Sequence, residues 1–424
     1  MPLPDPGMLV GGVIAALVGG LFGWTQTAIT GRWLAACERE LAEGTAGEAG
    51  AAGTAVDRSA AIFGAAIIVV VGLWWWEVRS FAELPRDDSG APLVFTFAAV
   101  AGRWLAHTLL LWLLVAATWI DFRYRVIPDW VTIPGLLAGL VVAWLAPGTL
   151  LPVGAELTRP FATALTLPDV LGWAGPLEQA VAERGAWVAF HPAALVATLV
   201  LFSVWWRVGT GPDLGVSDGP PEGDGAMATD APASPGWPRL GLLVVGWLVL
   251  AGAWSIGGLR FEAMFTGLVG AVVAGGVVWG TRAGASLALG REAMGLGDVT
   301  LMAMVGAWLG WQASVLACFL GVLFGLVHGV VQIVRHRESE LPFGPSLCAG
   351  TVAVMLGWRP LWKGAAASFA ETGQLVGIVL AVVVGTALSL WVWSSLGPAA
   401  RRVALAAMLL LGALLVGWLM VLQG

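Results

Sequence analysis

Charged residues are scarce in this 424-residue sequence. They make up 11% of it, against about 25% in ordinary soluble domains. Apolar residues make up 58%, and the mean hydropathy is +0.85. This composition excludes a soluble globular enzyme, a disordered chain and a nucleic-acid-binding protein. It predicts an all-α, polytopic membrane helix bundle, with room for roughly ten to twelve transmembrane helices of about 20 residues.

Cysteines and other metal-binding patterns are equally sparse. The three cysteines, Cys37, Cys318 and Cys348, lie far apart, and no C-x-x-C pair occurs, which argues against a zinc ribbon and a redox dithiol. Cys318 and Cys348 fall in apolar runs, so we expect them to be packing residues. The sequence also has no nucleophile elbow, phosphate-binding loop or metal-ligand cluster, and we therefore predict neither a metal nor another cofactor.

The apolar runs predict where the helices lie. Because lipid offers backbone groups no hydrogen-bond partners, helices are the only plausible spanning elements for runs of this length. We expect them at about 8–29, 60–78, 96–120, 131–146, 187–206, 240–257, 262–281, 298–310, 313–334, 345–358, 374–393 and 403–422. Several runs are shorter than 20 residues, so one or two helices are expected to cross only half of the membrane.

Arginine positions predict the orientation. With twelve spans, four arginine-containing loops fall on one face, after the third, seventh, ninth and eleventh spans, and include Arg123, Arg282, Arg335 and Arg401. The positive-inside rule assigns that face to the cytoplasm, with both termini outside.

Polar segments divide the chain into five predicted regions. These are an N-terminal membrane region with two spans and a cytoplasmic loop at 30–59 (1–92), a helix pair with the first candidate aspartate (93–146), an insertion (147–257), a region with the second candidate aspartate in a G-x-G-D motif (258–358) and a two-span C-terminal extension (359–424). The insertion contains an outer segment, two spans and a linker at 208–238. This linker has five acidic residues and no basic residue. Its Gly, Pro and Ala content indicates a flexible tether.

Two aspartates adjoin long apolar runs. Asp121 ends one apolar helix and Asp298 opens another, and in the predicted topology both lie at the cytoplasmic edge. Two carboxylates held close share a proton, so one can activate water while the other donates to a peptide carbonyl oxygen. Gly295 and Gly297 are expected to give the backbone before Asp298 unusual angles and a close approach to a substrate.

A purely structural interpretation of these acids stays open. Asp298 is a suitable N-cap for its helix, and Asp129 suits that role even better for the next span after Asp121. Asp121 itself is poorly explained as a cap, because the dipole at a helix C-terminus disfavours an anion.

Taken together, three ordered motifs resemble the type IV prepilin peptidases, aspartyl proteases of the bacterial inner membrane. The motifs are W-I-D-F-R-Y-R-V-I-P-D-W-V-T-I-P at 119–134, G-R-E-A-M-G-L-G-D-V at 290–299 continuing to Trp311, and L-P-F-G-P-S-L at 341–347. They cover about a quarter of the chain.

The resemblance implies that Asp121 and Asp298 are the catalytic pair and that Asp129 is a nearby non-catalytic position. It implies supporting roles for Gly295, Gly297, Pro342, Phe343, Gly344 and Pro345. The implied reaction is cleavage of a short basic leader from a type IV prepilin or pseudopilin precursor at the cytoplasmic membrane face, in pilus assembly or type II secretion, without a metal. The implied partners are this precursor and the lipid bilayer, with no nucleic acid; the sequence does not define an oligomeric state.

Three departures from the family pattern stand out. Family members usually have Lys two residues after the second aspartate, where this chain has Thr300. The two aspartates are 177 residues apart, more than is usual, because of the insertion. Many members carry an N-terminal loop with two C-x-x-C pairs and methylate the new N-terminus using S-adenosylmethionine. Cys37 stands alone, which argues against methyl transfer here.

Alternative functions also stay open. A catalytically degenerate relative could serve as a membrane scaffold of a pilus or secretion system, as Thr300 and the insertion suggest. A transporter with intramembrane proton sites would place its acids in mid-span rather than at span ends. The acidic linker could attract basic leaders electrostatically.

Overall fold

The structure, a computed structural model, is helical throughout its described parts. These are residues 67–80, 97–151, 192–210, 236–290, 294–336 and 343–370, with single positions at 17 and between 377 and 395. No strand occurs in these ranges, which agrees with the predicted all-α bundle. The expected spans 8–29 and 403–422, most of 374–393, the outer segment after 151 and most of the acidic linker lie outside the described residues.

Eight helices of the described residues follow the predicted apolar runs. They are α3 (Phe97–Tyr124), α4 (Asp129–Leu145), α8 (Pro192–Thr210), α9 (Gly236–Ile256), α10 (Gly258–Leu289), α11 (Leu296–Leu309), α12 (Trp311–His336) and α13 (Gly344–Ala370). However, α10 and α13 extend eight and twelve residues beyond the predicted ends. A π-helix, η1 (Trp75–Arg79), and a 3₁₀ helix, η2 (Pro147–Thr149), add two short elements. α13 is kinked at Gly357, three residues before Pro360.

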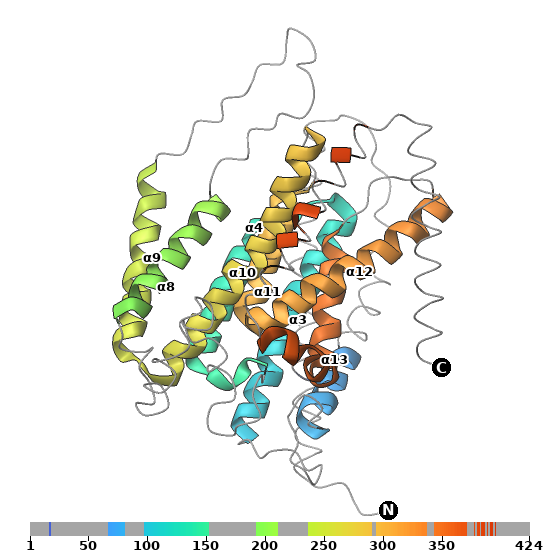
Figure 1. The fold of residues 1–424 in the computed structure, drawn as a ribbon. Coiled ribbons are helices and arrows are strands. Elements are labelled where there is room, and N and C mark those ends of the chain that lie inside the picture. Colours follow the sequence, from blue (N-terminus) through green and yellow to red (C-terminus); the bar gives the residue numbers. More distant parts are fainter. Residues whose placement is uncertain are drawn as a thin grey trace, which may run out of the picture.

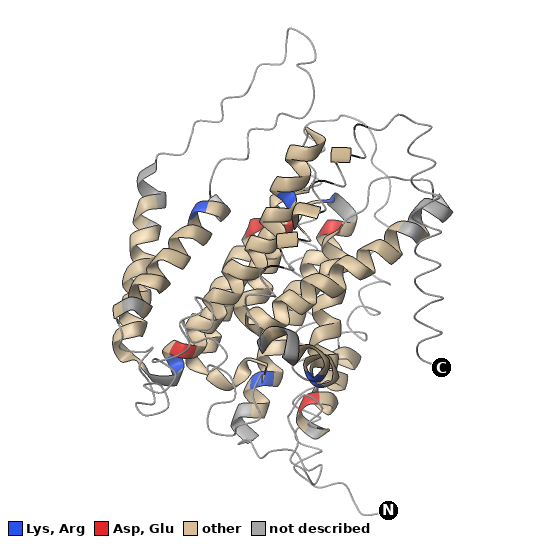
Figure 2. Cartoon of the chain, viewed as in Figure 1, with Lys and Arg blue, Asp and Glu red and all other residues tan. Residues whose placement is uncertain are grey.

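Several helices have the composition of membrane spans. Within the described residues, three are long and apolar enough to cross a bilayer: Val100–Phe122, Arg260–Leu289 and Trp311–Gly329. Five shorter apolar helices accompany them. Among the described residues, the positions of charged residues gather toward the two ends of the bundle and leave its middle almost uncharged (Figure 2). This pattern is that of a polytopic membrane protein, while the expected total of ten to twelve spans stays a prediction.

α10 and α11 form the centre of the bundle (Figure 1). α10 contacts α11, α4, α12 and α8, and α11 also packs on α4. The backbones of Gly270 in α10 and Gly306 in α11 are in direct contact. A methyl group added to either glycine would overlap the carbonyl group of the other. Such glycine contacts let membrane helices approach closely where no hydrophobic effect drives them together. α8 and α9 form a separate pair at one side, joined to the bundle mainly through α10.

α11 is too short to cross a bilayer. Its 14 residues span about 21 Å, whereas the hydrocarbon core is about 30 Å thick. Every side chain from Val299 to Leu309 is buried among the surrounding helices. α11 is therefore a half-length helix inside the bundle, of the kind that the short apolar runs predicted.

A buried hydrogen bond between Glu77 and His107 holds residues 67–79 against α3. His107 Nδ1 lies 2.7 Å from Glu77 Oε1, and both side chains are buried. Arg103, one turn earlier on α3, donates two hydrogen bonds of 3.1 and 3.0 Å to the carbonyl oxygen of Gly148 in η2. His107 precedes Asp121 by 14 residues, or about 21 Å along α3. This contact therefore lies in the first half of α3, well away from Asp121.

Candidate active site

Asp121 lies in the last turn of α3. Its side chain is buried, at 5% exposure. The Arg125 N–H donates a 2.8 Å hydrogen bond to the Asp121 carbonyl oxygen, and Arg125 has a left-handed backbone with φ of 55°. This geometry ends α3 abruptly and turns the chain toward α4. Asp121 is thereby fixed at the end of a rigid helix.

Asp298 lies in the first turn of α11. It is the third residue of that helix, and its side chain is 8% exposed. The N-cap is Gly295, so the expectation that Asp298 is the N-cap is wrong. A carboxylate in the first turn is nevertheless favoured by the helix dipole. Arg282 supports the preceding turn, because its Nε donates a 2.8 Å hydrogen bond to the carbonyl oxygen of Met294.

The two carboxylates meet beside the start of α13. They lie close enough to interact electrostatically, and the Gly344 N–H donates a hydrogen bond to the Asp121 carboxylate. A methyl group added at Gly344 would lie 2.5 Å from Asp121 Oδ2 and 2.7 Å from Ile127 Cδ1. The structure thus brings three sequence motifs, centred on Asp121, Asp298 and Gly344, into one buried cluster at the ends of α3, α11 and α13.

Gly297 is needed for space rather than for backbone freedom. A methyl group there would lie 2.8 Å from both Cβ and the carbonyl oxygen of Ile127. Gly295 has an ordinary extended backbone, with φ of −67° and ψ of 153°, and Gly297 is helical. The expectation of unusual angles at these two glycines is therefore wrong. The close approach at Gly297 is to the loop that follows Asp121, so this glycine lets the two aspartate-bearing segments pack together.

Thr300 joins α11 to α4. Its buried hydroxyl accepts a 2.9 Å hydrogen bond from Thr132 and lies 3.1 Å from the carbonyl oxygen of Gly297. Asp129 Oδ1 is 3.4 Å from the same hydroxyl, at the edge of hydrogen-bonding distance. Asp129 is exposed and is the first residue of α4, after Pro128 as N-cap, so the expectation that it caps this helix is wrong. The position where the family usually has Lys therefore holds a neutral, buried link between helices.

The L-P-F-G-P-S-L motif at 341–347 contains the first turn of α13. The Phe343 carbonyl oxygen accepts hydrogen bonds from the N–H groups of Ser346 and Leu347. The Phe343 ring lies against Gly325 of α12, where a methyl group would come within 2.7 Å of it. Pro345 occupies the first turn of α13, where its missing N–H costs no helical hydrogen bond. Pro342 lies outside the described residues.

Cys348, predicted only as a packing residue, lies beside the two aspartates. It is buried, as expected, but it also lies within electrostatic range of both Asp121 and Asp298, and it shares a hydrogen bond with Thr118. The signal for this placement was its spacing, because Cys348 follows Gly344 by four residues and so lies on the same face of α13. Among the described residues, no group of three His, Cys, Asp or Glu side chains could hold a metal ion.

Substitution of the two glycines before Asp298 tests the packing role of Gly297. We expect Gly297→Ala to lower the free energy of unfolding by about 1–3 kcal/mol, because the added methyl overlaps Ile127. Gly295→Ala is the matched control, since its methyl would meet only a backbone nitrogen at 3.9 Å. Reversible unfolding of the detergent-purified protein would measure both. Equal stability of the two variants would contradict this role.

Comparison with known proteins agrees with the motif pattern. The profile of the Type IV leader peptidase family matches residues 108–175 and 237–330, segments that contain Asp121 and Asp298. No solved structure gives a significant match. The segment between the two matches falls within the predicted insertion.

Several curated relatives carry the name "Prepilin leader peptidase/N-methyltransferase". One from Aeromonas salmonicida is 32% identical over 150 residues, which cover 29% of this chain and 52% of the relative. One from Aeromonas hydrophila is 32% identical over 158 residues, covering 31% and 54%. One from Pseudomonas aeruginosa is 40% identical over 101 residues, covering 23% and 35%. The chain thus matches about half the length, or less, of these relatives. Through the two segments that carry its buried aspartates, the chain is similar to the type IV leader peptidase family.

Proposed function

We propose that this protein is a membrane-embedded aspartyl endopeptidase that removes the basic leader from type IV prepilin-like precursors. The observation that carries the proposal is the buried pair of Asp121 and Asp298, which two distant segments bring within electrostatic range of each other. The prepilin leader peptidase names of the relatives support the substrate class.

The chemistry follows from two carboxyl groups that share a proton. The ionised carboxylate removes a proton from a water molecule, and the resulting hydroxide attacks the scissile carbonyl carbon while the protonated carboxyl donates to the carbonyl oxygen. The tetrahedral intermediate then collapses: one of its hydroxyl groups gives a proton to the ionised carboxylate, the C–N bond breaks, and the leaving nitrogen takes up the proton of the other carboxyl group. Asp121 and Asp298 together supply every proton transfer in this sequence. The Gly344 N–H helps by holding the Asp121 carboxylate in one orientation.

The short α11 supports access to a membrane-bound substrate. Because α11 is about 9 Å shorter than the hydrocarbon core, its Asp298 end can lie below the membrane surface. The precursor's apolar helix would then remain in the bilayer while its end reaches the aspartate pair. Arg282, expected in a loop, is instead buried within α10, but Arg125 is exposed just after the Asp121 turn. By the positive-inside rule, this arginine favours the cytoplasmic face of a bacterial inner membrane for that end of the bundle.

Two alternatives make different use of the same residues. A transporter would need acids in mid-span, whereas Asp121 is in a last turn and Asp298 in a first turn. The degenerate-scaffold hypothesis rests on Thr300, which supplies no cation near the aspartates. Substitution of the aspartates separates the two ideas, because a scaffold would not depend on their proton transfer.

Replacement of each aspartate by asparagine tests the proposed chemistry. We expect Asp121→Asn and Asp298→Asn each to lower precursor processing at least about 10³-fold, because asparagine cannot exchange a proton in this role. Asp129→Asn is the matched control and should retain processing within about ten-fold. Co-expression with a prepilin, read by precursor size, would measure this. Processing by either of the first two variants at the wild-type rate would contradict the proposal.

Two glycines of α13 test the contact between Gly344 and Asp121. We expect Gly344→Ala to reduce processing about 10²-fold, because the added methyl displaces the Asp121 carboxylate. Gly364→Ala, on the same helix, is the control, since nothing lies within 4 Å of its added methyl. Cleavage of a precursor by the purified variants would measure the difference. A fully active Gly344→Ala variant would show that the contact does not position Asp121.

A further inference from the structure

We infer that the groove between α8 and α9 binds a phospholipid with an anionic headgroup, whose phosphate is held by Arg207. The groove lies in the inserted helix pair, and its volume is about 460 Å³. This volume is within the range of pockets that take one small molecule. The groove belongs to neither the aspartate pair nor the segments around it, so the inference does not rest on the proposed function.

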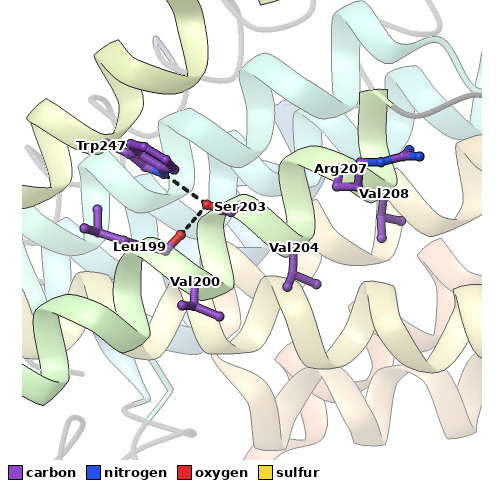
Figure 3. A pocket seen from close by; sticks show the side chains of 7 residues that line it. All are labelled: Leu199, Val200, Ser203, Val204, Arg207, Val208 and Trp247. Atoms are coloured by element: carbon purple, nitrogen blue, oxygen red, sulfur yellow. Dashed lines mark hydrogen bonds between the residues drawn. The ribbon is translucent and has the colours of Figure 1, made fainter. Parts of the chain in front are cut away.

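The lining of the groove is apolar along its length and basic at one end (Figure 3). Five of its seven side chains are aliphatic or aromatic: Leu199, Val200, Val204, Val208 and Trp247. The other two are Ser203 and Arg207. The α8 residues are three adjacent pairs that repeat every four positions, so they form one stripe on the helix. The stripe is about 14 Å long from Leu199 to Val208. A stripe of this kind offers an acyl chain a continuous apolar surface.

The Ser203 hydroxyl already makes two hydrogen bonds within the protein, so it is not the polar contact for a ligand. Its hydroxyl accepts a 3.0 Å hydrogen bond from Trp247 Nε1 and donates a 2.6 Å hydrogen bond to the carbonyl oxygen of Leu199. These two bonds fix the Trp247 ring against α8 and shape one wall of the groove (Figure 3). The polar atoms that remain available are those of the Arg207 guanidinium.

Arg207 lies where a lipid headgroup would be. α8 has 19 residues and is about 28 Å long, close to the thickness of the hydrocarbon core, and Arg207 is in its last turn. Its side chain is exposed, and among the described residues no carboxylate pairs with it. A guanidinium matches a phosphate with two parallel hydrogen bonds, and basic pockets between membrane helices commonly bind anionic headgroups.

The shape of the groove suits a flexible acyl chain. The exposed walls, with Val200 at 53% and Val204 at 48% exposure, leave the groove open along its side for a flexible chain to enter from the bilayer.

Native mass spectrometry of the detergent-purified full chain tests the inference. Phosphatidylglycerol and phosphatidylcholine with identical acyl chains are titrated separately, and the retained lipid is counted. We expect wild-type protein to retain one phosphatidylglycerol at concentrations where phosphatidylcholine is mostly lost. Arg207→Gln should weaken phosphatidylglycerol binding about five-fold, the effect of one basic residue near a headgroup. Val204→Trp should abolish the bound lipid by filling the groove.

Matched variants control for general surface effects. Arg359→Gln removes another exposed arginine, and Val196→Trp enlarges another exposed valine of α8 outside the groove; both should bind as wild type does. Asp121→Asn should also bind normally, which separates this test from that of the peptidase. Equal retention of both lipids by wild type, or unchanged binding in Arg207→Gln, would overturn the inference. Displacement of phosphatidylglycerol by one equivalent of an uncharged apolar helical peptide would instead assign the groove to a helix.

Discussion

Two carboxyl groups buried among apolar helices impose the main constraint on this structure. A single ionised carboxylate in such surroundings costs several kcal/mol, and a second one close by adds repulsion unless a proton is shared. The structure meets this constraint with helix ends. Asp298 lies in the first turn of α11, where the helix dipole favours an anion, and Asp121 accepts a hydrogen bond from the Gly344 N–H. The rest of the bundle serves to hold these three helix ends together.

Backbone contacts between helices provide this rigidity. Gly270 and Gly306 bring α10 against α11, and Gly297 lets the start of α11 lie against the loop after α3. Thr132 and Thr300 add a buried hydrogen bond between α4 and α11. The indole of Trp308 adds another, by donating a 2.8 Å hydrogen bond to a carbonyl oxygen of α4. α11 is therefore fixed at both ends, which suits a helix too short to be held by the bilayer.

The sequence predicted the helices well but their partners poorly. Long apolar runs leave helix as the only option in lipid, so the boundaries of α3 and α4 are close to those expected. Contacts between distant segments have no such local signal. The contacts between Glu77 and His107 and between Thr132 and Thr300 depend on how the helices pack. The role of Gly297 also depends on packing: it was expected to provide backbone freedom, and it instead leaves space for Ile127. Neither aspartate is an N-cap, because α4 begins at Asp129 itself and α11 begins two residues before Asp298.

The central claim is that the segments bearing Asp121 and Asp298 meet at one end of the bundle. Cysteine crosslinking tests it most directly, with Asp121→Cys and Asp298→Cys combined in a chain whose native cysteines are replaced by alanine. We predict that a short bifunctional maleimide links the two cysteines within one chain. Asp121→Cys combined with Ser255→Cys should not be linked, because Val299, next to Asp298, lies beside Gly275, about 25 Å along α10 from the end of α9. If both aspartate positions react with a monofunctional maleimide but never crosslink, the account is contradicted.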